Sequence, residues 1–287
     1  MKKWRIPITV LALLLAVLAF SYSQNNWLTT TRFSVASDKL PGSFDGYRIV
    51  QLSDLHGKTF GYQQRPLLNK VRRAKPDLIV FTGDMIDSDT PGDRSRSLTL
   101  MKGLTAVAPV YWVTGNHELS PNLDSLKQEL TDVGVHVLAN RGVPIEQGGE
   151  RIWLSGIDDP RLGSSSGSLD TEVIVNEHME QAIQDRPQGL YTILLSHRPE
   201  IFDFYVRKGF DLILTGHAHG GQIRLPFLGP LYAPDQGFSP QLTEGAHKRE
   251  GSVMIVNRGL GNSVIPQRLL NRPEIVVVTL QAKPSSP

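Results

Sequence analysis

The chain has 287 residues, of which 40% are hydrophobic and 20% are charged. These proportions are ordinary for a globular protein, and the length allows one large hydrophobic core or two small ones. The formal net charge of +2 is close to balance, so the chain carries no nucleic-acid-binding signature. Cysteine is absent, which excludes disulfides and thiolate metal sites and leaves His, Asp, Glu and Asn as the available metal ligands.

The N-terminal segment differs in kind from the rest of the chain. Basic residues precede an apolar run over residues 8–20, which is shorter than the ~20 residues of a comfortable membrane span. The run fits a signal-peptide core or a short signal anchor, and the cleavage signal is poor because Phe20 or Tyr22 occupies the middle of each candidate site. We therefore expect an uncleaved anchor over residues 1–24 in the cell membrane, with the catalytic domain on the extracytoplasmic side.

A tether and one folded domain are expected after this anchor. Residues 25–44 are polar and mixed in composition, as is typical of a connecting segment. Over residues 45–280, short apolar runs alternate with helical patterns and no internal repeat is visible, which favours a single α/β domain. Residues 281–287 are expected to form a C-terminal tail.

The spacing of apolar residues predicts the elements of this domain. Strands are expected at 48–52, 78–81, 110–113, 191–195, 212–215, 253–256 and 275–280, with a hairpin formed by 143–145 and 152–154. Helices are expected at 67–74, 95–107, 120–133, 173–185 and 200–208. The Gly/Ser-rich stretch 158–170 is expected to be a mobile loop, and residues 223–250 show no clear period.

Five of the predicted strands are each followed, within a few residues, by side chains that can bind a metal ion. Ligand sites in α/β sheets form at the carboxyl ends of strands, so we expect these side chains to converge. Of the eight histidines, only His136, His178 and His247 lie elsewhere, and these are interpreted as surface or loop residues. The residues at the strand ends are Asp54, His56, Asp84, Asn116, His117, His197, His217 and His219.

The residue types at these positions indicate the chemistry. Carboxylates and imidazoles with one amide suit divalent cations such as Mn²⁺, Fe²⁺ or Zn²⁺, although any one of the histidines alone could be structural. Seven candidate ligands are more than one ion needs, and two ions that share a bridging carboxylate would use them all. Two such ions can clamp a phosphoryl group and deprotonate a water for in-line attack. Asp84 is the natural bridge, because no histidine stands beside it in its motif.

These blocks resemble the signature of the calcineurin-like metallophosphoesterases. They occur in the family's order within residues 45–280 and are Asp54-x-His56, Gly83-Asp84, Gly115-Asn116-His117-Glu118, His197 and Gly216-His217-x-His219. The resemblance implies an α/β fold that is a four-layer αββα sandwich, with two mixed β-sheets face to face and helices outside.

The resemblance also implies roles for the residues. Asp84 would bridge two metal ions, and His117 would face the substrate and either protonate the leaving group or stabilise the transition state. One ion would be held by Asp54, His56, Asp84 and His219, and the other by Asp84, Asn116, His197 and His217.

Further sequence details point to a branch of the family. Ser88 stands where many phosphoprotein phosphatases have Arg, which argues against protein-phosphatase activity. Residues 220–226 and 257–261 look like a bacterial, membrane-associated phosphodiesterase branch. We therefore expect a membrane-anchored phosphodiesterase that uses metal-bound hydroxide for in-line attack on phosphorus, without a covalent enzyme intermediate. Its substrate would be a phosphodiester or a pyrophosphate, soluble or lipid-linked.

Two alternative functions stay open at this stage. The first is a UDP-2,3-diacylglucosamine-type lipid-nucleotide pyrophosphatase, which needs an apolar groove beside the metals and a cytoplasmic active site. The second is a catalytically silent metal-binding scaffold, which the intact ligand set and His117 argue against.

Some residues admit two interpretations. Glu118 would orient an imidazole or be an acid at a helix start, and Arg198 would contact phosphate or lie on the surface. The apolar residues of the irregular segment would form a lipid-facing edge or, as we slightly prefer, hold a loop onto its own domain. These are Phe227, Leu228, Leu231, Tyr232 and Phe238.

Overall fold

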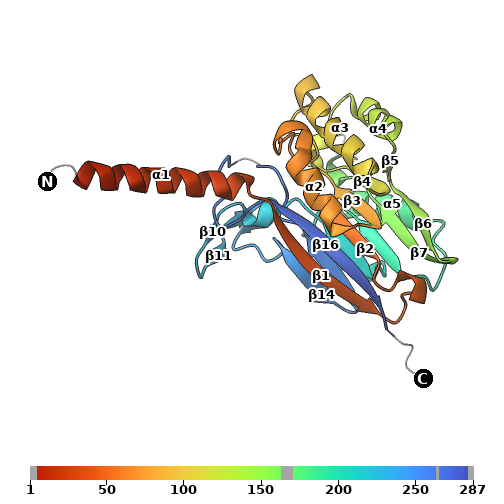
Figure 1. The fold of residues 1–287 in the computed structure, drawn as a ribbon. Coiled ribbons are helices and arrows are strands. Elements are labelled where there is room, and N and C mark those ends of the chain that lie inside the picture. The colour runs from red at the N-terminus through yellow and green to blue at the C-terminus, as the bar shows by residue number, and fades with distance from the viewer. Residues whose placement is uncertain (1–4, 163–170, 263–264, 284–287) are drawn as a thin grey trace.

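The computed structural model describes residues 5–162, 171–262 and 265–283. Two six-stranded mixed sheets make up most of the body, with helices on their outer sides (Figure 1). This arrangement confirms the predicted four-layer sandwich. The strands and helices predicted from the sequence recur, some of them with shifted ends, and the structure adds strands that the sequence did not predict.

The first sheet has the strand order β1-β16-β2-β3-β4-β5. β16 runs antiparallel to β2, and the other neighbouring pairs are parallel. In chain order the strands are β1 (Thr29–Ser37), β2 (Arg48–Leu52), β3 (Leu78–Thr82), β4 (Val110–Val113), β5 (Val135–Val137) and β16 (Glu274–Ala282).

The second sheet has the strand order β14-β15-β9-β8-β7-β6. Its two outermost pairs are antiparallel, including the predicted hairpin of β6 and β7, and its inner pairs are parallel. The strands are β6 (Arg141–Gln147), β7 (Glu150–Gly156), β8 (Thr192–Leu195), β9 (Leu212–Thr215), β14 (Gly245–Arg249) and β15 (Ser252–Val256).

Helices cover the outer face of each sheet. α2 (Arg65–Ala74), α3 (Pro91–Thr105) and α4 (Leu123–Asp132) pack on the first sheet, and α5 (Thr171–Ile183) and α6 (Phe202–Arg207) pack on the second. The structure also has short 3-10 helices at Gly42–Phe44, Tyr62–Gln64, Asn116–Glu118, Pro160–Leu162 and His219–Gly221.

The inner strands are apolar on both faces because each face is covered. In β3, Ile79 and Phe81 belong to the cluster beneath the helices, whereas Leu78 and Val80 belong to the cluster between the two sheets. Successive side chains of a strand point to opposite faces, so a continuous apolar run is what a sheet buried on both sides requires. This burial holds the carboxyl ends of the strands in fixed positions.

Part of the predicted tether differs from its sequence-based description, and part of the predicted mobile loop lies outside the described residues. Residues 29–37, predicted as part of a tether, form the edge strand β1, which pairs in parallel with β16. An edge strand buries few of its side chains, and Val35 is the one buried residue of β1, which explains its polar sequence. Residues 163–170 of the predicted mobile loop lie outside the described residues.

Residues 224–238 form two small hairpins, and residues 245–249 form β14 of the second sheet. β10 (Arg224–Leu225) pairs with β11 (Gly229–Pro230), and β12 (Tyr232–Ala233) pairs with β13 (Gly237–Phe238). Two-residue strands are too short to show a period in the sequence, so the irregular pattern is accounted for by the structure.

The first helix, α1 (Arg5–Asn26), projects from the body of the protein (Figure 1). Its segment Pro7–Asn26 is long and apolar enough to cross a membrane, by length and composition alone. Large apolar side chains along it are exposed, among them Ile8, Leu11 and Leu15. The helix continues beyond the apolar run because the polar groups of its last turns bind the body, through Ser21 and Asn25 for example.

Candidate metal centre and active site

The predicted site residues lie together where strands of both sheets end. β2, β3 and β4 of the first sheet and β8 and β9 of the second are each followed, within a few residues, by such side chains. The structure thereby brings all of them to one place. The catalytic role of His117 and the role of the others as metal ligands stay predictions. The predicted site residues are Asp54, His56, Asp84, Asn116, His117, His197, His217 and His219.

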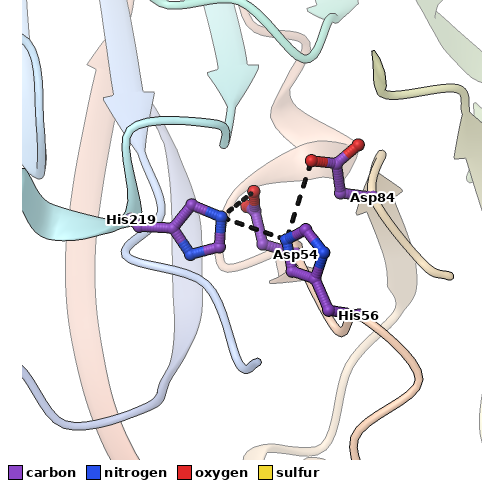
Figure 2. A group of neighbouring side chains, drawn as sticks. All are labelled: Asp54, His56, Asp84 and His219. Carbon is purple, nitrogen blue, oxygen red and sulfur yellow. Dashed lines mark hydrogen bonds and ion pairs between the residues drawn. The ribbon is translucent and has the colours of Figure 1, made fainter. Parts of the chain in front are cut away.

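One cluster consists of Asp54, His56, Asp84 and His219, whose candidate ligand atoms all lie within 4.8 Å of one another. Figure 2 shows their side chains converging from separate segments. His219 Nε2 lies 3.1 Å from His56 Nε2 and 3.3 Å from Asp54 Oδ1. His56 Nε2 lies 3.7 Å from Asp84 Oδ2. Two imidazoles and two carboxylates therefore surround one small space.

A second cluster of Asp84, His197 and His217 lies beside the first. His197 Nε2 is 3.2 Å from Asp84 Oδ2 and 3.1 Å from His217 Nδ1. The oxygen Asp84 Oδ2 thus faces both clusters. Asn116 lines the same cavity as Asp84 and His217, and its Oδ1 is buried without a hydrogen-bond partner among the described residues.

The residues present fit divalent metal ions. The donor atoms are carboxylate oxygens, imidazole nitrogens and one amide oxygen, which is the set that Mn²⁺, Fe²⁺ and Zn²⁺ accept. The unpartnered Asn116 Oδ1 is a buried acceptor of the kind that usually has a partner. His197 Nδ1 lies 2.8 Å from the Thr82 carbonyl oxygen, so this nitrogen donates and Nε2 is left to bind an ion.

The backbone at the site adopts conformations that side chains normally avoid. Asp54, His56, Asp84, His217 and His219 all have φ between 48° and 65°. Such left-handed residues are uncommon outside glycine, and they persist where the surrounding structure holds them in place. Sharp turns of this kind let the candidate ligands point back into one space at the strand ends.

Gly216 allows the segments to approach closely. A Cβ atom at Gly216 would lie 1.9 Å from Ser53 Oγ and 2.4 Å from Asp54 Oδ2. No side chain fits there without displacing a candidate ligand, which gives a physical reason for the glycine before His217.

Glu118 is an acid at a helix start, as one of the two sequence-based interpretations proposed: it lies in the 3-10 helix Asn116–Glu118 and accepts the N–H of the preceding Gly115. It is fully buried, and its carboxylate accepts backbone N–H groups of Asp84, Met85, Ile86 and Gly115, at 2.9, 2.7, 3.2 and 2.6 Å. Burial and the Asp84 charge raise the pKa of the Glu118 carboxyl to about 7, against hydrogen bonds from the backbone that lower it. Glu118 therefore fixes the loop after β3 against the loop after β4.

His117 lies at the edge of the site, with 31% of its side chain exposed. Its backbone N–H donates to Asp84 Oδ1 at 2.9 Å, and its Nδ1 lies 3.1 Å from the carbonyl oxygen of Asp87. A carbonyl oxygen only accepts, so Nδ1 carries a proton and Nε2 is left for a substrate. The Asp87 side chain lies between two rings, 3.2 Å from His56 Nδ1 and 3.5 Å from His117 Nδ1.

Asp235, which the sequence analysis did not single out, binds the Nε2 atom of the His217 ring. Its Oδ2 lies 2.8 Å from His217 Nε2, an arrangement that orients a metal-binding imidazole and makes it more basic. Asp235 stands in the turn between β12 and β13, and its neighbours in the sequence give no signal for this role. A pairing of this kind becomes visible only once the chain is folded.

Arg198 does not lie on the surface, in contrast to one of its two sequence-based interpretations. It is buried, and its guanidinium binds Asp159 at 2.6 Å and also contacts Glu200 and Asp235. These acidic partners hold the guanidinium beside Asp235, which in turn binds His217.

Asp84 and His197 form a buried ion pair. Burial would raise the pKa of Asp84, but His197, His56 and His117 hold it well below its usual range. Burial would likewise lower the pKa of His197, but the charge and hydrogen bond of Asp84 raise it to about 10. An imidazole must lose this proton to bind a metal ion, so metal affinity is expected to rise with pH.

A cavity of about 410 Å³ opens over the clusters. Arg161 and Gln222 contribute polar groups to its wall, and Tyr232, Pro234 and Ile265 contribute apolar ones. The arrangement can place a charged group over the candidate ligands while an apolar group lies against the wall.

The three histidines that were interpreted as surface or loop residues lie outside the site. His136 stacks on Tyr111, and His178 and His247 bind backbone carbonyl groups.

Residues 47–221 match the family model of calcineurin-like phosphoesterases. The chain belongs to this family. Calcineurin-like phosphoesterases use divalent metals, and the chain is accordingly a metal-dependent phosphoric ester hydrolase. The resemblance inferred from the sequence motifs is thereby confirmed.

The chain is also similar to individual proteins. The chain is 32% identical to an uncharacterized metallophosphoesterase, YkuE, of Bacillus subtilis, over 91% of this chain and 88% of the relative. It is 25% identical to the phosphodiesterase YaeI of Escherichia coli, over 90% of each. It is 31% identical to a bovine transmembrane protein with a metallophosphoesterase domain, over 88% of this chain and 57% of that protein.

Proposed function

We propose that this chain is a membrane-anchored phosphodiesterase that holds two divalent ions, one at each cluster. The observation that carries the proposal is the position of Asp84 Oδ2, which lies 3.7 Å from His56 Nε2 in one cluster and 3.2 Å from His197 Nε2 in the other. One oxygen between two sets of imidazoles is what a bridging carboxylate requires. The Escherichia coli relative named a phosphodiesterase supports the diester as substrate.

The proposed ligand sets are those implied by the motifs. Asp54, His56, Asp84 and His219 would hold one ion, and Asp84, Asn116, His197 and His217 the other. When bound, the two ions would neutralise phosphoryl oxygens and activate a water molecule for in-line attack on phosphorus.

The remaining chemistry falls to side chains of the cavity wall. His117 presents Nε2 toward the substrate. With both ring nitrogens protonated, it can give the Nε2 proton to the departing alkoxide or bind a developing negative charge. Arg161 lines the same cavity and lies 3.7 Å from Asp235, so it can turn its guanidinium toward a phosphate oxygen. Asp87 would fix the orientation of the His117 ring through its carbonyl oxygen.

The anchor is proposed to be α1. Its exposed apolar side chains point in all directions around the helix, and 11% of its most apolar window is buried in the body. A helix that is apolar all round needs an apolar environment. The relatives named transmembrane proteins support this assignment. An extracytoplasmic domain stays the proposal, and protease accessibility of a C-terminal tag in spheroplasts would test it.

A lipid-linked pyrophosphate is the second candidate substrate. The apolar wall formed by Tyr232, Pro234 and Ile265 favours it, because the apolar part of a lipid next to the pyrophosphate can lie against this wall. A tag that is protected in spheroplasts would place the site in the cytoplasm and favour this second candidate.

The test uses the full chain in detergent micelles, stripped of metal and titrated with Mn²⁺. We expect Mn²⁺-dependent hydrolysis of an aryl phosphodiester, faster than that of the matching monoester. Asp84→Asn should lose both bound metal and activity, whereas His117→Ala should keep its metal and lose about 10²–10⁴-fold in kcat. His136→Ala, a histidine outside the site, is the matched control. A folded, metal-loaded chain that hydrolyses neither ester would contradict the proposal and favour the scaffold.

A further inference from the structure

An unusual group of apolar side chains extends from the small hairpins. Phe227 and Leu228, in the turn between β10 and β11, are 108% and 74% exposed, and Phe238 in β13 is 84% exposed. We call these three residues the apolar tip. The preferred interpretation from sequence, in which they hold the loop onto its own domain, is wrong for all three. An exposed apolar patch beside a functional cavity usually marks a contact surface.

The backbone of the tip is held in a conformation that its residues do not favour. Phe227 has a φ of 68°, in the left-handed region that a bulky side chain normally avoids. The β10–β11 pairing of Leu225 with Gly229 closes the turn around it. A strained aromatic residue that faces solvent gains nothing from packing within its own domain, so its position points to a contact outside the domain.

The helix α1 is attached firmly to the body at its C-terminal end. Ser21 Oγ donates to Gln267 Oε1 at 2.6 Å, and the backbone N–H of Arg268 donates to Asn25 Oδ1 at 2.8 Å. Lys58 Nζ donates to the carbonyl oxygen of Asn25. These contacts fix the direction in which α1 leaves the body, so they also fix how a bilayer around α1 would meet the domain.

The segment that binds the end of α1 through Gln267 and Arg268 also binds the β10–β11 hairpin through Leu269. Ile223 forms a bridge with Leu269, and the Arg224 N–H donates to the Leu269 carbonyl oxygen at 3.2 Å. Figure 1 shows β10 and β11 on the side of the body from which α1 projects, level with the last turns of the helix. A bilayer that surrounds α1 would therefore reach the tip.

Side chains suited to a membrane surface surround the end of α1. Trp27 is 60% exposed directly after the helix, and Trp is enriched where a helix leaves the bilayer. It lines a hollow of about 530 Å³ with Lys70, Arg73 and Arg272. Within the described ranges, none of these three cations forms an ion pair with an acidic side chain. Unpaired cations at this level complement anionic lipid headgroups.

We propose that the apolar tip and this basic hollow form a second membrane contact. The tip enters the boundary between headgroups and acyl chains of the bilayer that α1 spans, and Lys70, Arg73 and Arg272 lie against anionic phospholipid headgroups. The inference rests on the proposed anchor. Tyr232 connects the catalytic cavity to the apolar tip, because it lines the cavity and its ring lies 5.6 Å from that of Phe238. The cavity therefore lies at the edge of the membrane contact.

The absence of cysteine from the sequence allows a direct test. The full chain carrying Leu228→Cys is labelled with an environment-sensitive fluorophore and placed in vesicles of phosphatidylcholine with phosphatidylglycerol. We expect at least a twofold loss of fluorescence when the lipids carry spin labels on their acyl chains. Leu14→Cys on α1 is the positive control, and Arg151→Cys, exposed at the start of β7, is the negative control.

The outcomes separate this inference from the proposed anchor. Quenching at position 14 without quenching at position 228 overturns the second contact and leaves the anchor in place. Quenching at neither position overturns both. Substituting Lys70, Arg73 and Arg272 together by Gln should remove the part of the quenching that depends on phosphatidylglycerol, and an unchanged dependence would overturn the headgroup contact.

A variant of the tip checks that the effect is not a loss of folding. The double variant Phe227→Ser with Leu228→Ser should hydrolyse a soluble aryl diester within twofold of the unaltered chain, since neither residue lines the catalytic cavity. Hydrolysis of the same diester head on a vesicle-embedded lipid should fall at least fivefold. Equal rates of the double variant and the unaltered chain on vesicles would contradict the proposed role of the tip.

Discussion

Replacing Glu118 by Gln tests whether its carboxylate holds the two loops of the site together. At pH 8, above its pKa of about 7, the carboxylate is charged and both oxygens accept. One oxygen binds Met85 and Ile86, and the other binds Asp84 and Gly115 at 2.9 and 2.6 Å. The Gln amide has only one acceptor oxygen, so its NH₂ must face two backbone N–H groups that have no other partner among the described residues.

The size of the effect follows from those two donors. A buried donor left without a partner costs ~1–3 kcal/mol, so Glu118→Gln should lower the free energy of unfolding by about 2–6 kcal/mol. For a domain of this size that corresponds to a melting temperature lower by roughly 5–20 °C. Because the affected N–H groups flank Asp84, metal affinity should fall as well.

The assay is thermal and urea unfolding of the metal-free full chain in micelles at pH 8, followed by near-ultraviolet circular dichroism. Glu177→Gln is the matched control, because Glu177 is exposed on α5 and surface substitutions change stability by less than ~0.5 kcal/mol. If Glu118→Gln costs less than about 1 kcal/mol, with an unchanged urea dependence, the proposed role of the carboxylate is refuted.

Two further predictions concern the second cluster. Asp235→Asn should weaken metal binding by ~10–100-fold, because the amide no longer holds the His217 ring as a charged acceptor; competition with a fluorescent chelator measures this, and unchanged affinity would argue against the role of Asp235. In the presence of a metal chelator, the melting temperature should fall as pH rises from 6.5 toward 10, because the pKa of His197 in the folded chain is about 10. The stabilisation that protonated His197 provides is complete only below the ordinary pKa of histidine. His197→Gln should flatten this fall, and a parallel fall in the variant would assign it to other groups.

The features that the sequence predicted well are those encoded by neighbouring residues. Apolar runs such as 78–81 are buried on both faces, so they stand out as strands without any knowledge of their partners. The polar residue that follows each run is then placed at the sheet edge by the geometry of the fold. This explains why residues as distant as Asp54 and His219 could be assigned to one site before the structure was known.

The features that the sequence missed depend on distant partners. β1 is polar because it lies at an edge, and its pairing with β16 joins residues that are separated by most of the chain. Asp235 reaches His217 from the turn of the second small hairpin, and two partners of Arg198, Asp159 and Asp235, come from distant segments. Local propensity carries no information on such pairings. The left-handed conformations of Asp84 and His217 are likewise imposed by the surrounding fold.

The pairing of β1 with β16 has a consequence for how the domain is made. Thr29 lies beside Glu274, and Ser37 lies beside Ala282, so the strand that follows the anchor waits for a partner from the far end of the chain. During synthesis the anchor and β1 leave the ribosome first, and β1 stays without its neighbour until β16 emerges. Contacts of such long sequence separation form late and slow folding. Assembly of this domain is therefore expected to be post-translational, with β1 exposed to chaperones or to mispairing until the final strand arrives.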